Sequence, residues 1–503
     1  MQCHRSAKCA EGWDTRQLFR HNLGQVEVYC HGSNPRTRAP APLDVAMTLR
    51  RFVTVVSVSL WLISAASAAA WGQGVQPYPN AFTDRQLHSK TAMAPPAVNT
   101  VFQDPDFGAL MVRVTDGNTN PKQLNGYFRN PKTEANAWSA DGGKFFVVGQ
   151  QKNTLAFGFD PSTMLISPLP GAGSGGGFAI PLYMGPTFSF VDPDLMYGVM
   201  KSAPLTIANY RYSTRAVTPL FDTTTCGMQP PLVAGPHITS SDISISADDN
   251  RIEINAGGNQ FGNRTFVIVY DQKLGCRWYN TYTGQIGGAW GPAGQAVVPQ
   301  TFLIDHAYIS GSGQYVKIEQ GHVGYYVWDL TSLNVQACYD KGGPGCGGYD
   351  SLGYDTYVNA PGVTDEMNIY RRTLSDVTNI THLVYPLPLP HLWGMEKHFT
   401  WSGGHLNNNV PVCGTTYAAN GSDTVTQPYD GEVFCVETDL NASTIWRFAH
   451  NRAIWDPEYY WSDPFGSVSL DGRFFMFSSG WDGQVGLNKN GDPRSDVWIV
   501  KLD

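Results

Sequence analysis

The residues with the clearest chemical potential stand at one position of a repeated sequence phrase. The phrase is an apolar residue, Ser, two turn residues and an apolar run, as in Trp138-Ser139-Ala140-Asp141-Gly142 followed by Phe145-Phe146-Val147-Val148. Four residues before the Ser, three copies carry Asp242, His306 and His398. Imidazole and carboxylate groups bind divalent cations, and a His near its unperturbed pKa is suited to take up a proton at neutral pH.

This register predicts a metal site for manganese or calcium formed by Asp242, His306 and His398. It also predicts a catalytic set of His306, His398 and Asp463. A base that removes a proton beside a carboxylate performs the β-elimination that cleaves uronate polysaccharides. The alternative is structural, because a repeat also places hydrogen-bonding side chains in one register to join neighbouring units.

Substrate contacts are expected from residues close to these positions. Glu134 and Asn136 flank the register in the first copy, and Tyr460 and Trp461 precede the last copy among acidic residues. Aromatic faces beside carboxylates suit sugar rings, which have apolar faces and polar edges. The expected ligand is a carbohydrate polymer or oligosaccharide, and packing between repeats is the alternative for the aromatic pair.

The scaffold must bring distant copies of the phrase together. An Asp-Gly between two apolar segments predicts a tight hairpin, and a third strand ending in Asp or Glu follows several copies. Four-stranded antiparallel units that repeat along a chain are typical of propeller blades. The long gap between Ser310 and Ser402 predicts an additional blade with its inner hairpin near residues 354–358. We therefore expect an all-β, seven-bladed propeller, with six blades as the alternative.

The two ends of the repeat region predict how the ring closes. The chain ends on the apolar segment 497–502, a third strand with no fourth strand behind it. The segment 110–115 precedes the first copy and has the pattern of a fourth strand without its hairpin. Pairing the two segments would remove both sheet edges. A β-helix or a pair of sandwiches is the alternative, and neither explains why the ends are complementary.

The composition agrees with a turn-rich β protein. The chain has 503 residues with 53 Gly and 33 Pro, 12% aromatic residues and only 15% charged residues. A coiled coil or a disordered chain would be rich in charge and poor in aromatics, so both classes are excluded. The formal net charge of −8 and the lack of a basic run after Arg51 exclude nucleic acid as an expected partner.

The N-terminal region predicts export. Arg50 and Arg51 precede a short apolar stretch that ends in alanines near Ala70, which is the pattern of a signal peptide. The apolar part is too short to span a bilayer, so no membrane span is expected in the mature chain. The predicted organisation is a misassigned leader (1–46), a signal peptide (47–70), an N-terminal extension (71–99) and one propeller domain (100–503). We expect a secreted or periplasmic monomer with a formal charge of about −12, because residues 1–70 hold eight Lys/Arg and four Asp/Glu.

The cysteines agree with an oxidising compartment. Six remain after residue 70, and no Cys-x-x-Cys zinc motif occurs among them. Neighbours in the sequence are the expected disulfide partners, although fifteen pairings are formally allowed. The expected pairs are Cys226 with Cys276, Cys338 with Cys346, and Cys413 with Cys435.

The phrase Trp138-Ser139-Ala140-Asp141-Gly142-Gly143-Lys144-Phe145, with the closing Val112-Arg113-Val114-Thr115-Asp116, resembles the repeat of TolB-like propellers. Periplasmic scaffold proteins, peptidase propellers and oligogalacturonate lyases share this repeat, and the resemblance covers residues 100–503. It implies the propeller fold. In the lyases, several His and a Gln hold a metal at the channel mouth, and His306 and His398 look similar to those His residues. This chain has no Arg in that register and no His-x-His pair with an upstream Gln.

Two functions follow as hypotheses. The first is a metal-assisted uronate polysaccharide lyase that acts at a channel mouth formed by Asp242, His306, His398 and Asp463. The second is a non-catalytic propeller that serves as a protein or carbohydrate interaction module.

Overall fold

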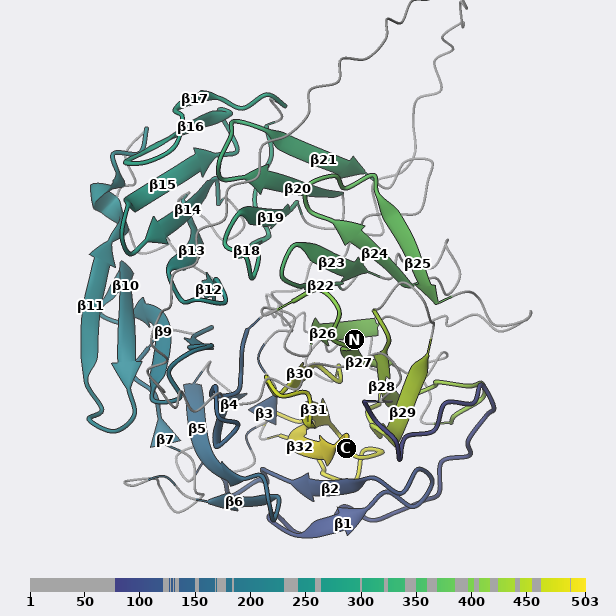
Figure 1. Ribbon diagram of the computed structural model, residues 1–503. Coiled ribbons are helices and arrows are strands. Elements are labelled where there is room, and N and C mark those ends of the chain that lie inside the picture. The colour runs from purple at the N-terminus through teal and green to yellow at the C-terminus, as the bar shows by residue number, and fades with distance from the viewer. Residues whose placement is uncertain are drawn as a thin grey trace, which may run out of the picture. The chain divides into compact units, whose positions relative to one another are not determined.

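Hairpin-forming repeats build seven antiparallel sheets that surround a common centre in the computed structural model (Figure 1). The chain divides into two units, Met1–Ala65 and Ala66–Asp503, and the sheets belong to the second. The structure describes residues 77–503 apart from these segments: 121–125, 127, 130, 132–134, 150–152, 168, 170–177, 183–184, 230–242, 258–263, 299–300, 321–323, 340–349, 360–368, 385–396, 402–406, 417–423, 439–443, 455–462 and 489.

Each sheet is one blade, with its first strand innermost in most blades. Blade 1 consists of β3 (Phe128–Arg129), β4 (Lys144–Gly149), β5 (Asn153–Asp160), β6 (Leu165–Ser167) and β7 (Phe178–Ala179). Blade 2 consists of β8 (Thr187–Phe188), β9 (Leu195–Met200), β10 (Ala203–Arg211) and β11 (Val217–Asp222). Blade 3 consists of β12 (Ile243–Ile245), β13 (Arg251–Ala256), β14 (Phe266–Asp271), β15 (Gly275–Asn280), β16 (Gln285–Gly288) and β17 (Gly294–Gln295). A short 3-10 helix, η2 (Thr223–Cys226), follows β11.

Blades 4 to 6 each have four strands. Blade 4 has β18 (His306–Ile309), β19 (Tyr315–Glu319), β20 (Gly324–Asp329) and β21 (Val335–Tyr339). Blade 5 has β22 (Asp350–Leu352), β23 (Thr356–Asn359), β24 (Ile369–Thr373) and β25 (Ile380–Val384). Blade 6 has β26 (Lys397–Trp401), β27 (Val412–Thr416), β28 (Glu432–Val436) and β29 (Ile445–His450). The hairpin expected near residues 354–358 is confirmed as the β22–β23 turn of blade 5. The prediction of seven blades is correct.

Blade 7 closes the ring with strands from both ends of the repeat region. Its order is β1 (Val101–Gln103), β2 (Leu110–Arg113), β32 (Asp496–Lys501), β31 (Phe474–Ser479) and β30 (Gly466–Val468). The predicted pairing of the N-terminal strand with the last strand is confirmed by the register Val112↔Ile499, and the two ends lie side by side in Figure 1. The structure adds β1 as a fifth, outermost strand.

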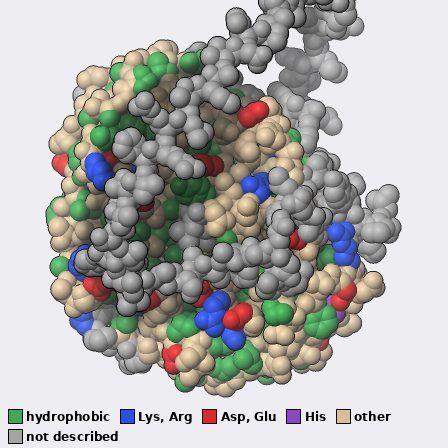
Figure 2. All heavy atoms as spheres, in the orientation of Figure 1, with side chains coloured by type: hydrophobic (Ala, Val, Ile, Leu, Met, Phe, Trp, Pro, Cys, Tyr) green, Lys and Arg blue, Asp and Glu red, His purple; other side chains and the backbone are tan. Residues whose placement is uncertain are grey.

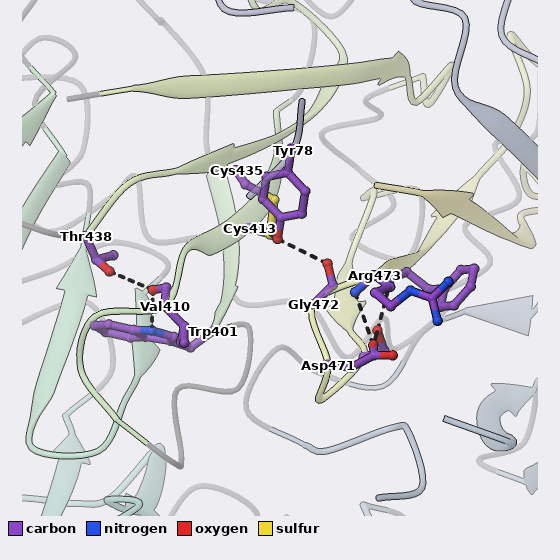
Figure 3. Close-up of a disulfide and its surroundings, with 11 residues drawn as sticks. Tyr78, Trp401, Val410, Cys413, Cys435, Thr438, Asp471, Gly472 and Arg473 are labelled. Carbon is purple, nitrogen blue, oxygen red and sulfur yellow. Dashed lines mark hydrogen bonds between the residues drawn. A yellow bond between two sulfur atoms is a disulfide. The ribbon is translucent and has the colours of Figure 1, made fainter. Parts of the chain in front are cut away.

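The repeated Ser-x-Asp phrase forms a hydrogen-bonded turn between the first two strands of a blade. In blade 1 the Ser139 hydroxyl donates to Asp141 Oδ1 (2.7 Å) and accepts from Lys144 N (2.9 Å). Gly142 adopts φ +68°, a conformation that favours glycine. Ser469 and Asp471 repeat the same bonds in blade 7. Figure 3 shows Asp471 of this turn, which accepts from Arg473 N. These turns gather at one face of the ring, which we call the turn face, and the inner strands begin at the other, which we call the mouth face.

Residues 77–99, which we call the strap, run along blades 6 and 7. The ring of Tyr78 packs edge-on against Trp446 and Phe448, and its hydroxyl donates to Gly472 O (3.1 Å; Figure 3). Further along the strap, buried Arg447 donates to the Asp84 carboxylate (3.0 Å). The strap therefore covers the outer edge of β29 and reaches across to the next blade.

Two of the expected disulfides are present. Cys226 bonds Cys276 and so joins the end of blade 2 to β15 of blade 3, whereas Cys413 bonds Cys435 between β27 and β28 (Figure 3). Cys338 is also disulfide-bonded. Cys346 lies outside the described residues, so its pairing stays a prediction.

In the part of the chain that the structure describes, no helix is long and apolar enough to cross a membrane. The predicted leader and signal peptide lie outside the described residues.

Candidate functional site

The centre of the ring is a narrow space lined by the innermost segments of all seven blades. Figure 2 shows this centre hollowed, with hydrophobic side chains inside it. The cavity has a volume of about 30 Å³, room for roughly two water molecules. Small polar residues from six blades line it: Asn136, Thr187, Ser244, Ser351, Thr400 and Ser467. A sugar is too large for this space, so a ligand of that size must bind at a mouth of the channel.

The polar residues that line the channel join neighbouring blades. The Ser244 hydroxyl accepts from Ile309 N of blade 4 (2.9 Å) and donates to Glu253 Oε2 (2.9 Å). Asn136 was expected to contact substrate, and it is buried with its amide donating to Phe188 O of blade 2 (3.2 Å). These bonds give Asn136 and Ser244 a structural role at the ring axis.

His306 begins the inner strand of blade 4 at the mouth face. Its Nε2 lies 3.5 Å from Asp305 Oδ1, and the same carboxylate oxygen lies 3.6 Å from Arg264 Nη2 of blade 3. The side chains of Asp305, His306 and Arg264 are 44%, 17% and 8% exposed, so the group is open to solvent on the side of Asp305. The Asp305 carboxylate therefore lies between an imidazole and a guanidinium that come from different blades.

Arg264 is held in place from within blade 3. Its Nη1 donates to Asn255 Oδ1 (2.9 Å), and its backbone carbonyl accepts from Ile304 N (2.8 Å). The backbone bond docks the segment that leads into His306 onto the entrance of β14. Arg264 and His306 therefore reach one site from different blades.

His398 occupies the equivalent position in blade 6 but is deeply buried. Only 1% of His398 and 3% of Asp463 is exposed, and His398 Nε2 lies 3.9 Å from Asp463 Oδ2. The imidazole packs on the ring of Phe465 at a centroid distance of 4.4 Å. The structure thus brings His398 and Asp463 together across the boundary between blades 6 and 7.

The lack of a side chain at Gly414 allows β26 and β27 to come close together beside His398. A Cβ atom at Gly414 would lie 2.4 Å from the His398 carbonyl oxygen, closer than real Cβ atoms come to a backbone atom. Across the same pair of strands, His398 aligns with Thr415, whose hydroxyl donates to Pro464 O beside Asp463. Strand β27 thus holds the backbone of His398, and Thr415 links this strand to the segment before β30.

The remaining predicted site residues lie outside the described part of the chain: Glu134, Asp242, Tyr460 and Trp461. Among the described residues, no group of three His, Cys, Asp or Glu side chains is arranged to hold a metal ion. His306 with Asp305 and His398 with Asp463 are separate pairs, and neither is a metal site by itself. The described donors do not fit the expected metal.

Two polar features close to the inner strands were not predicted. Arg264 lies just before β14, the third strand of blade 3. The register of the repeat compares only positions of the first strands, so it could not identify Arg264 as a site residue. Lys317 of β19 forms a buried ion pair with Asp350 of blade 5, and its ammonium lies 4.0 Å from the Tyr325 ring centroid. Burial raises the pKa of Asp350, while the Lys317 ammonium acts in the opposite direction. Alternation of apolar and charged residues in β19 was the only sequence signal for this pair.

Comparison with solved structures finds β-propellers. An oligogalacturonate lyase from Vibrio parahaemolyticus is 12% identical, with 82% of this chain and 99% of that chain covered and a TM-score of 0.49. An oligogalacturonate lyase in complex with manganese is 13% identical over 82% and 99% of the two chains, with the same TM-score of 0.49. TolB from Acinetobacter baumannii is 14% identical over 55% and 60%, with a TM-score of 0.30.

No protein family model matches the sequence, and no curated protein matches it. The propeller fold and the blade count rest on the strand pairing described above.

Proposed function

We propose that the protein binds uronate-containing polysaccharide at the mouth face and cleaves it by β-elimination, with His306 as the base. The observation that carries this proposal is the Arg264–Asp305–His306 group, in which one carboxylate oxygen lies within 3.6 Å of both a guanidinium and an imidazole. The channel itself is too narrow for a sugar, so the reaction takes place at its mouth.

Each group has a distinct role in the proposed reaction. His306 takes the proton from C5, next to the uronate carboxylate, and Arg264 stabilises the negative charge that develops on that carboxylate. The electron pair of the C5–H bond forms the C4–C5 double bond, and the C4–O bond breaks with its electron pair on the leaving oxygen. That oxygen takes a proton from solvent water, and the imidazolium of His306 returns its proton to the solvent. Nδ1 of His306 is buried, so Nε2 is the nitrogen that takes the proton, and the Asp305 carboxylate lies beside this same nitrogen at the mouth.

His398 and Asp463 act as positioning residues in this proposal. Both are buried, so they hold the first strands of blades 6 and 7 in place and do not touch substrate. Glu134, Tyr460 and Trp461 stay as predicted substrate contacts. A divalent ion, manganese or calcium, would need donors such as Asp242 from outside the described residues, and no step above depends on it.

The test is product formation from a panel of uronate polymers: polygalacturonate, alginate, hyaluronate and heparosan. The unsaturated product absorbs in the ultraviolet, and we expect this signal from one polymer. His306→Gln should lower the rate by at least a hundredfold. His88→Gln is the matched control. The side chain of His88 is 18% exposed, close to the 17% of His306, and it also bonds an Asp, but it lies on the strap. No unsaturated product from any polymer, with the protein folded, rejects the lyase proposal.

The second candidate function is a non-catalytic interaction module. The observation that favours it is the burial of His398 and Asp463, two of the three residues predicted to be catalytic. Binding of a polymer without any unsaturated product, and without bound metal by elemental analysis, would support this function.

Export and a monomeric state complete the proposal. The disulfides agree with an oxidising compartment. We expect the N-terminus of the exported protein to lie near Trp71, which N-terminal sequencing checks, and we expect one chain per particle by sedimentation.

A further inference from the structure

An exposed tyrosine stands at the rim of the mouth face, next to the segment that leads to His306. Tyr282 follows the outer strand β15 of blade 3 and is 59% exposed, although large aromatic side chains are usually well buried. Leu303, three residues before His306, is 40% exposed. Neither side chain contributes to the hydrophobic clusters between the blades.

The backbone around Tyr282 is held firmly, so its exposure is not a result of a loose loop. Tyr282 N donates to Asn280 Oδ1 (3.0 Å), and its carbonyl accepts from Thr301 Oγ1 (3.2 Å). The neighbouring Thr281 donates to Phe302 O through its hydroxyl (2.8 Å). An aromatic side chain on a fixed backbone binds a ligand with little loss of conformational entropy.

The same hydrogen bonds place Tyr282 close to the proposed site. Thr281 N donates to the carbonyl oxygen of Thr265 (2.7 Å). Thr265 is the residue directly after Arg264. The chain from Phe302, bonded to Thr281, to Asp305 spans no more than roughly 10 Å. Tyr282, Leu303 and the Asp305 group thus follow one another from the rim of blade 3 towards the channel mouth.

We infer that Tyr282 and Leu303 form a second sugar-binding subsite, which we call the outer platform. The outer platform binds the apolar face of a pyranose ring. That ring lies further along the polymer than the ring from which His306 removes the C5 proton. This inference rests on the proposed function and adds to it that the protein prefers long chains to disaccharides. A ring at the platform and a ring at His306 belong to one chain, so binding at one subsite raises the local concentration at the other.

The test compares a long polymer with its disaccharide by titration calorimetry. The polymer is the one that the wild-type protein binds from the uronate panel, and the measurements use the His306→Gln background to prevent cleavage. Tyr282→Ala should weaken binding of the long polymer by roughly three- to tenfold, the size of an aromatic contact. Binding of the disaccharide should be unchanged, and Tyr282→Trp should retain the affinity for the polymer.

Val191→Ala is the matched control, because Val191 is 63% exposed beside the Ser189 turn of blade 2 on the turn face. An unchanged polymer affinity in Tyr282→Ala, or an equal loss for polymer and disaccharide, overturns the outer platform and leaves the proposed function in place. If the wild-type protein binds none of the uronate polymers, both the platform and the proposed function are wrong.

Discussion

Arg113 of β2 and Asp496 of β32 form a buried ion pair that joins the two ends of the propeller. Arg113 Nη2 lies 2.5 Å from Asp496 Oδ2, and the carboxylate also accepts from Arg494 Nη1 (3.0 Å). Asp496 is fully buried, and Arg113 is 11% exposed at its side chain. The pair locks the register in which β2 completes blade 7, so the ring has no open edge at its closure.

Removal of Arg113 should destabilise the closed ring. Arg113→Ala leaves the Asp496 carboxylate buried with one cationic partner fewer, and we expect a loss of about 3 kcal/mol in the free energy of unfolding. Urea unfolding followed by tryptophan fluorescence measures it. Arg473→Ala is the matched control, because Arg473 pairs with Asp503 near the surface, where such a pair contributes less than about 1 kcal/mol. Equal losses in the two variants would contradict a special role for the closure pair.

His450 should make the stability depend on pH. Burial lowers the pKa of His450 to about 3, and the Asp106 carboxylate acts in the opposite direction. The unfolded chain binds the proton near pH 6.5 and the folded protein does not, so stability should fall as the pH drops from about 6.5 towards 3.

His450→Gln should reduce this slope between pH 6.5 and 4, measured as the free energy of unfolding at each pH. His88→Gln is again the control, since the side chain of His88 is 18% exposed on the strap, whereas His450 is fully buried. A slope in His450→Gln that equals the wild-type slope would show that other groups cause the acid sensitivity.

The disulfide between blades 2 and 3 should contribute strongly to stability. Cys226 and Cys276 are 50 residues apart in the sequence, and closing a loop of this length contributes about 4 kcal/mol in the chain-entropy account. The double variant Cys226→Ala, Cys276→Ala should lose roughly this amount of free energy of unfolding.

The partner of Cys338 is a separate prediction. Mass mapping of the unreduced protein should find Cys338 linked to Cys346. Any other partner for Cys338 rejects that predicted pair.

Gly414→Ala should displace the first strand of blade 6. The new Cβ would lie 2.4 Å from the His398 carbonyl oxygen, so β26 must shift, at a cost of about 1–3 kcal/mol. Polymer binding should weaken as well if His398 positions the mouth of the channel. Gly480→Ala is the control, since its Cβ would meet the nearest atom, Arg494 O, at an ordinary 3.5 Å. Thermal unfolding and calorimetry measure the two effects.

The fold could be predicted because its signals are local and repeated. The Ser-x-Asp phrase encodes a turn through bonds within six residues, such as Ser139 with Asp141 and Lys144, and each copy marks one hairpin. The unmatched strands at the two ends predicted the closure that β2 and β32 form. Spacing also predicted the Cys226–Cys276 and Cys413–Cys435 disulfides.

The site could be predicted only in part, because register does not determine burial or partners. His306 and His398 share a position in the repeat, yet His306 meets Asp305 beside Arg264 at the surface, whereas His398 is covered by Phe465 and Asp463. Register also did not reveal that Asn136, predicted as a substrate contact, joins two blades through the bond from its amide to Phe188 O.

The sequence by itself determined the all-β class, the number of blades and the closure, since these depend on turns and on alternating apolar strands. Only the tertiary structure decided which polar side chains meet. Arg264 and Asp305 are 41 positions apart in the sequence and belong to different blades, so their contact depends on how the blades pack around the ring. That packing buries His398 and leaves the group at His306 open at the mouth.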